Sequence, residues 1–170
     1  MADEGEKGVL SRPLKPTRIV GALVLVAAVL YALVLMASND YVPVSVKRAA
    51  CLSNLKDIGQ AMFLYASDHD FLYPPTTWMD ALKPVVRGGE DGLRCPAVPR
   101  DDKPVFGYAY SASQAGKFIV FANDPKTTPL VFDSTLLVRN AVGDLTTLPH
   151  PRRHGGNCLL YADGHAKAVK

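Results

Sequence analysis

The feature that most constrains the fold is a segment with helical periodicity between Cys51 and Asp70. Its apolar residues recur at steps of three and four, which places them on one face of a helix: Leu52, Leu55, Ile58, Gly59, Met62, Tyr65 and Ala66. We expect this helix to begin near Val44, just after Pro43, and to end near Asp68, because two prolines follow shortly afterwards. The later part of the chain must supply the surface that covers this apolar face.

A second constraint is the uninterrupted apolar run Ile19–Ala37, which contains no charged residue. Because about 20 residues cross a bilayer as a helix, the run predicts one transmembrane helix between a tail (1–18) and a domain (38–170). Basic residues precede the run and Asn39 and Asp40 follow it, which favours a cytoplasmic tail and an exported, periplasmic or extracellular domain. A cleaved secretory signal is the alternative, with a weak site at Met36-Ala37-Ser38.

The composition limits the possible partners. The chain has 170 residues and a formal charge of +3, and residues 38–170 are enough for one compact domain. No basic cluster is interleaved with aromatic residues, so the sequence argues against nucleic-acid binding. The membrane is the partner that the sequence itself predicts.

The second half of the chain predicts a small sheet. Phe106, Tyr108 and Tyr110 alternate with smaller residues, as in a half-buried strand. Short apolar runs at 118–122 and 130–133 predict two more strands, and 142–154 is expected to be a loop. The clearest hairpin joins 157–162 to 165–169 through Asp163-Gly164, which favours a type I′ turn. A short second helix is expected at 78–86, with Thr76 or Thr77 as its cap.

Two parts of the sequence resemble pilin-like proteins of the type II secretion pseudopilin G kind. The first is CLSNLKDIGQA at 51–61, followed by Tyr-Ala, Asp-His-Asp and Tyr-Pro-Pro up to residue 75. The second is RHGGN at 153–157 with YADGH at 161–165, and Arg94-Cys95-Pro96 lies between them. The most similar group consists of prepilin-type proteins with a His-(nine residues)-Asp-Gly motif. Here eight residues separate His154 from Asp163.

This resemblance implies an α+β, pilin-like fold in which a long helix packs on a small antiparallel sheet. It also implies a structural or assembly role in a secretion, pilus-like or cell-envelope complex, with homo- or hetero-oligomers. One segment departs from the family: Lys7-Gly8 is followed by Val9-Leu10-Ser11-Arg12-Pro13, and no Glu stands near the start of the apolar run. We therefore expect no processing by the leader peptidase and a pilin-like domain on an ordinary anchor.

The resemblance also assigns structural roles to residues near the C-terminus. The expected motif consists of His154, Gly156, Asn157, Asp163, Gly164 and His165. Within it, His154 and Asp163 are expected to bond backbone groups around the hairpin entrance. Cys51 and Cys95 are the favoured disulfide pair because both lie in matched segments, although sequence alone does not settle the connectivity. Cys158 is expected to be a buried, small apolar residue.

No catalytic or cofactor-binding residues are expected. A zinc site built from His150, His154, His165 and Asp163 is disfavoured because prolines and glycines prevent the helix that would align His150 with His154. A calcium site using Asp133, Asp144 and Asp163 has suitable oxygens but no defined spacing. Cys158 with His154 or His165 lacks a third orienting group. An envelope metal-dependent enzyme and an extracytoplasmic ligand-binding protein are the alternative functions.

Overall fold

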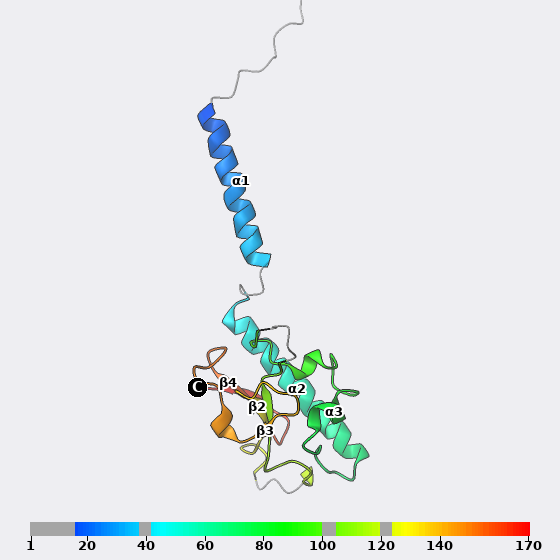
Figure 1. Cartoon of the computed structure of the whole chain (residues 1–170). Coiled ribbons are helices and arrows are strands. Elements are labelled where there is room, and N and C mark those ends of the chain that lie inside the picture. Colours follow the sequence, from blue (N-terminus) through cyan, green and yellow to red (C-terminus); the bar gives the residue numbers. More distant parts are fainter. Residues whose placement is uncertain (1–15, 38–41, 100–104, 120–123) are drawn as a thin grey trace, which may run out of the picture. The chain divides into compact units, whose positions relative to one another are not determined.

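The computed structural model describes residues 16–37, 42–99, 105–119 and 124–170, and the chain divides into two compact units, Met1–Val42 and Pro43–Lys170 (Figure 1). In the first unit, the 22-residue helix α1 (Pro16–Ala37) contains the apolar run. Its described side chains extend from Val20 to Val34, and the large apolar ones are more than half exposed. Over the described residues, no helix meets the length and apolarity needed to cross a membrane.

In the second unit, the long helix α2 (Val44–Asp68) has the bounds that the sequence predicts. The periodic face is buried at Leu55, Ile58, Met62 and Ala66, whereas Leu52 and Tyr65 at its margin are half-buried. The helix ends where the N–H of His69 bonds the carbonyl of Ala66. The next two residues adopt positive φ, which turns the chain away from the helix axis.

The sheet has five strands in the order β3-β1-β2-β4-β5. The strands are β1 (Tyr108–Ser111), β2 (Pro129–Asp133), β3 (Val142–Gly143), β4 (Asn157–Tyr161) and β5 (Ala166–Val169). Neighbours pair antiparallel except β3, which runs parallel to β1. The α+β class is confirmed, but the expectation of a purely antiparallel sheet is wrong, because part of the predicted loop 142–154 forms this edge strand.

Both faces of the central strands are buried. Tyr108 and Tyr110 lie in the main core with α2, whereas Ala109 lies in a second cluster with Phe132 on the opposite face. Leu136 and Leu148, from the segment between β2 and β4, pack against that second cluster. The aromatic alternation therefore marks a strand correctly, but the strand is fully buried because a loop covers the face expected to meet water.

Other predicted elements are shorter than expected. Helix α3 covers Trp78–Leu82 only, and the side chain of Thr77 makes no capping bond. Of the strand predicted at 118–122, the structure describes only residues 118–119. Phe118 forms an isolated bridge with Leu72, and the rest of the predicted strand lies outside the described residues. Two short 3-10 turns, η2 (Asp91–Leu93) and η4 (Leu145–Thr147), lie within segments predicted to be loop.

The C-terminal hairpin forms where it is predicted, but its turn differs. Gly164 has a φ of 86°, whereas Asp163 does not adopt positive φ. A type I′ turn requires positive φ at both central residues, so this prediction is wrong. The N–H of Gly164 bonds the carbonyl of Tyr161 and the N–H of Tyr161 bonds the carbonyl of His165, which is typical of a type I turn followed by a glycine bulge.

Candidate functional site

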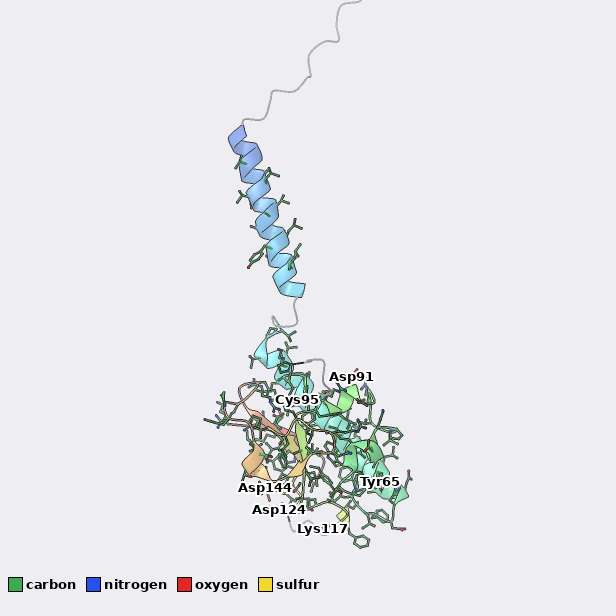
Figure 2. The ribbon with its side chains drawn as sticks, viewed as in Figure 1. Tyr65, Asp91, Cys95, Lys117, Asp124 and Asp144 are labelled. Atoms are coloured by element: carbon green, nitrogen blue, oxygen red, sulfur yellow. The ribbon has the colours of Figure 1, made fainter. Side chains whose placement is uncertain are left out.

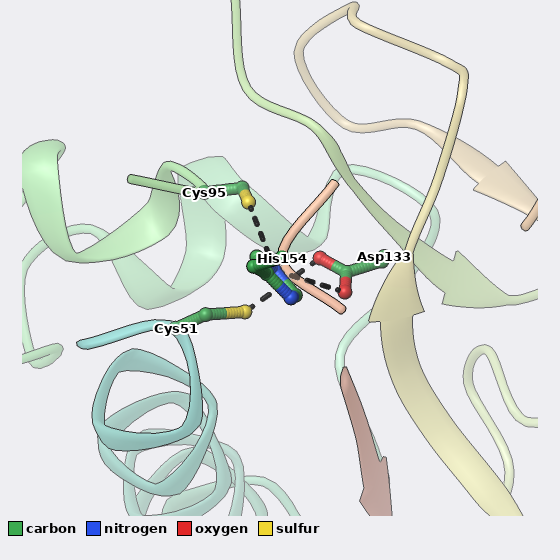
Figure 3. Close-up of side chains that lie close together, drawn as sticks. All are labelled: Cys51, Cys95, Asp133 and His154. Carbon is green, nitrogen blue, oxygen red and sulfur yellow. Dashed lines mark hydrogen bonds and ion pairs between the residues drawn. The ribbon is translucent and has the colours of Figure 1, made fainter. Parts of the chain in front are cut away.

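Four polar side chains from four segments meet in the core between α2 and the sheet (Figure 3). Cys51 lies on α2, Cys95 follows η2, Asp133 ends β2 and His154 precedes β4. One donor atom from each lies within 4.8 Å of the others. The exposed fractions of the four residues are 0%, 2%, 0% and 0%. We call these four residues the buried cluster.

The distances inside the buried cluster are short. His154 Nε2 lies 3.3 Å from Asp133 Oδ2 and 3.8 Å from Cys95 Sγ. Cys51 Sγ lies 3.6 Å from Asp133 Oδ1. Cys158 contacts the edge of the cluster, since its Sγ lies 3.8 Å from His154 Nδ1. The imidazole therefore has a sulfur near each of its two nitrogens.

The register of the sheet explains why Asp133 enters the core. Val131 and Asp133 are two positions apart and share one face of β2, and Asp133 pairs with Tyr108 of β1. On the other side, the N–H of Cys158 donates to Asp133 Oδ2 over 2.6 Å. Tyr108 in turn donates its hydroxyl to Cys51 Sγ at 3.3 Å. Backbone and side-chain bonds thus hold the carboxylate and one thiol in fixed positions.

Arg153 fastens the loop that carries His154 to the sheet. Its guanidinium donates to the carbonyls of Gly107 and Ser134. The segment that contains Cys95 is held beside the residues that precede β1, because the N–H of Cys95 donates to the carbonyl of Phe106 at 2.7 Å. Two loops that are far apart in sequence are therefore docked beside the start of β1, where they place His154 and Cys95 against α2.

The three cysteines differ in pKa. Hydrogen bonds with Cys51 lower the pKa of Cys95 and of Cys158 to about 6, and the same bonds raise the pKa of Cys51 above the usual thiol range. Burial lowers the pKa of His154, but bonds with Asp133, Cys158 and Cys95 outweigh it and raise that pKa to about 12. The ionisable groups of the cluster and Cys158 therefore titrate as one coupled unit.

The structure brings Cys51 and Cys95 together, as the resemblance implies, and shows all three cysteines free and buried. The disulfide between them stays a prediction. Cys158 is fully buried on β4, as expected, but its sulfur and N–H also contact polar groups. The expectation that His154 bonds backbone groups is wrong, because its described partners are a carboxylate and sulfur atoms.

The other candidate ligands lie elsewhere. His150 is exposed, and His165 pairs with Asp163 at 2.5 Å on the exposed hairpin, where its ring stacks on Tyr161. Asp144, labelled in Figure 2, caps η4 through Thr146 in an exposed loop. Within the part of the chain that the structure describes, the buried cluster is the only group of three or more ligating residues whose donor atoms lie close enough together to hold one metal ion. The histidine-rich zinc set and the three-aspartate calcium set are therefore not assembled among these residues.

The remaining motif residues serve close packing. A Cβ on Gly156 would lie 3.1 Å from the carbonyl oxygen of Val169, and one on Gly164 would lie 3.0 Å from the ring of Phe63 on α2. Asn157 begins β4 and is buried, and its Oδ1 has no hydrogen-bond partner among the described residues. The two glycines therefore allow β4 and the hairpin turn to approach their neighbours closely.

Sequence reasoning missed Asp133 as a partner of the cysteines. The available signal was its place at the end of an apolar strand, two residues after Val131, because this spacing points a carboxylate into the core. A buried carboxylate needs a partner, and Cys51, Cys95 and His154 are polar residues in segments that the sequence predicts to face the core or that carry the resemblance.

Comparisons with family models, with curated proteins and with solved structures found no match to this chain.

Proposed function

We propose that this chain is a membrane-anchored, pilin-like structural or assembly protein of a secretion, pilus-like or cell-envelope complex. The observation that carries the proposal is the location of the residues that resemble that family. Gly59 of α2 packs so closely on β4 that a Cβ would lie 2.9 Å from Leu160 Cδ1, and His154 is fully buried. Gly59 and His154, which lie in the two matched segments, therefore belong to the interior of the fold and do not line an accessible site.

The anchor in this proposal is the apolar run within α1. Its large side chains are strongly exposed in the isolated chain, for example 64% at Leu23 and 67% at Val34. Exposed apolar surface of this extent needs a lipid or protein partner. The basic residues before the run support a cytoplasmic N-terminus, which would leave the unit Pro43–Lys170 outside the cytoplasm.

The buried cluster argues against the alternative of an envelope enzyme. Cys158, His154 and Asp133 form a row that resembles a thiol, a base and an orienting carboxylate. A nucleophile must reach its substrate, yet all three residues are buried and Cys158 is fully enclosed. The cluster therefore supports a role inside the fold, and protein contacts are left to the outer surface.

Fractionation of native membranes tests this function. We expect the full-length chain in the membrane fraction, released by detergent but not by high salt, and crosslinked to other envelope proteins. Intact-mass and N-terminal analysis of the same sample should show a chain that begins at Met1 or Ala2. A soluble chain, or one cut near Ala37, would contradict the anchor, and a cut after Gly8 with methylation would show entry into a filament by the ordinary pilin route.

A further inference from the structure

We propose that Cys51, Cys95, Asp133 and His154 bind one Zn²⁺ ion that ties α2, both docked loops and β2 together. This inference rests on the geometry of the buried cluster and does not depend on the proposed envelope function. It differs from the metal sets that the sequence suggests, because His154 alone among the motif residues takes part. Asp163 and His165 lie on the exposed hairpin and are not involved.

The spacing of the donor atoms fits a tetrahedral ion. With zinc bonds of about 2.0–2.3 Å, neighbouring ligand atoms in a tetrahedron lie about 3.3–3.8 Å apart. The structure has 3.3 Å between His154 Nε2 and Asp133 Oδ2, and 3.8 Å between His154 Nε2 and Cys95 Sγ. Cys51 Sγ lies 3.6 Å from Asp133 Oδ1. The two separations from His154 Nε2 therefore match tetrahedral edges. The Cys51 distance is to the other carboxylate oxygen, and one donor atom from each of the four residues lies within 4.8 Å of the others.

The donor set also fits zinc chemically. Two thiolates and an imidazole are the ligands that select zinc over magnesium or calcium. With the carboxylate they bring three negative charges to a dication, so an ion in the centre removes most of the charge that burial would otherwise leave unbalanced. Four protein ligands complete the coordination shell without water, and this closed arrangement is typical of structural zinc sites.

Neighbouring groups hold the ligands in orientation. Asp133 Oδ2 accepts from the N–H of Cys158, and Tyr108 donates to Cys51 Sγ. His154 presents Nε2 to the cluster and Nδ1 to Cys158 Sγ, so a proton on Nδ1 would leave Nε2 free to bind the metal. Cys158 is thus a positioning residue that supports the imidazole, and Cys51 and Cys95 supply the two sulfur ligands.

A disulfide between Cys51 and Cys95 is the competing outcome. A disulfide would remove both thiolates, so one chain cannot hold the bond and the ion together. The two states differ in mass by two hydrogens and in metal content, which makes them separable by measurement.

The first experiment uses the full chain in detergent, purified under reducing conditions without chelator. We expect elemental analysis to find about one zinc per chain, and intact mass to show three reduced cysteines. Replacement by Co²⁺ should give thiolate-to-cobalt charge-transfer absorption and the intense d–d bands of a tetrahedral site. A folded, reduced chain that neither contains zinc nor binds added Zn²⁺ or Co²⁺ would overturn the proposal, as would a Cys51–Cys95 disulfide in chain taken from native membranes.

Variants then test which residues are the ligands. We expect Cys95→Ser and Asp133→Asn to weaken Zn²⁺ binding by more than about 100-fold, since losing an outer partner alone costs about 10–100-fold. His150→Ala, in the same loop as His154 but exposed, should bind as the unchanged chain does, and Cys158→Ala should keep the zinc stoichiometry. Loss of zinc in Cys158→Ala with retention in Asp133→Asn would refute this ligand set.

If a ligand variant does not fold, the unchanged chain still decides the question. Chelator should lower its melting temperature and added Zn²⁺ should restore it, because metal binding is coupled to folding. An unchanged melting temperature after zinc removal, confirmed by elemental analysis, would overturn the proposal.

Discussion

Gly107 occupies the point where the Cys95 loop meets the start of β1. Its φ is +84°, and a Cβ there would lie 2.5 Å from Val98 Cγ2 and 3.2 Å from Cys95 Cβ. Its carbonyl accepts bonds from Ser134 and Arg153. Both the backbone conformation and the close approach therefore require glycine at this position.

We expect Gly107→Ala to lower the free energy of unfolding by about 2–4 kcal/mol, because left-handed strain adds to overpacking. Denaturant titration of the detergent-solubilised chain measures this loss. Gly116→Ala is the matched control: φ is +67° there, but nothing lies within 4 Å of the added Cβ, so only the strain of about 1–2 kcal/mol is expected. Equal losses in the two variants would show that packing beside Cys95 contributes nothing.

At the scale of elements, helix α3 receives its cap from a distant loop. Asn140 Oδ1 accepts from the N–H groups of Met79 and Asp80, at 2.8 and 3.3 Å, and its Nδ2 donates to Asp80. Asn140 itself has a φ of 55°, which asparagine tolerates better than most residues. The sequence predicts Thr76 or Thr77 as the cap, but the side chain of Thr77 makes no capping bond. Capping by a distant side chain leaves no trace in the local sequence, so the role of Asn140 could not be predicted.

Replacing Asn140 with glycine should therefore destabilise the fold. Glycine keeps the positive φ but removes the three hydrogen bonds, and we expect a loss of about 1–2 kcal/mol in the free energy of unfolding. Thr77→Ala should change it by less than about 0.5 kcal/mol. Chemical denaturation of both variants measures the difference, and a larger loss in Thr77→Ala than in Asn140→Gly would contradict this assignment of the cap.

The difference between local and long-range interactions explains which elements could be predicted from the sequence. The bounds of α2 and the positions of β2 and the β4–β5 hairpin follow from local periodicity and turn residues. The edge strand β3 is two residues long and forms only because its partner β1 is already in place. The type of the hairpin turn also differs, because dipeptide preference does not distinguish a type I′ turn from a type I turn with a glycine bulge.

At the scale of the whole molecule, the candidate site depends on long-range docking. Cys51, Cys95 and His154 each stand out in the sequence, because they lie in the segments on which the proposed resemblance rests. Their meeting point depends on Asp133 and on Arg153, which ties the His154 loop to the carbonyls of Gly107 and Ser134. Such contacts between residues far apart in sequence follow from tertiary packing, and local patterns do not encode them.

Glu90 connects three further segments on the surface of the unit Pro43–Lys170. Its carboxylate contacts Arg94 at 2.7 Å, Lys83 at 3.1 Å and Arg139 at 3.2 Å. Arg94 and Arg139 also lie over the ring of Phe106, 4.9 and 5.5 Å from its centroid. The network therefore links the chain after α3, the η2 turn and the loop before β3.

The bonds from Arg94 and Lys83 lower the pKa of Glu90 from 4.5 to about 2. A carboxyl whose pKa falls on folding stabilises the fold above its unfolded pKa, and this contribution is lost as the pH falls through the folded value. We therefore expect Glu90→Gln to melt below the unchanged chain at pH 7, by a few degrees at most because the site is solvent-screened. The gap should close between about pH 4.5 and pH 2 and shrink in high salt. Parallel melting curves check this, and a gap that is the same at pH 7 and pH 2.5 would show that Glu90 acts through packing and not through its charge.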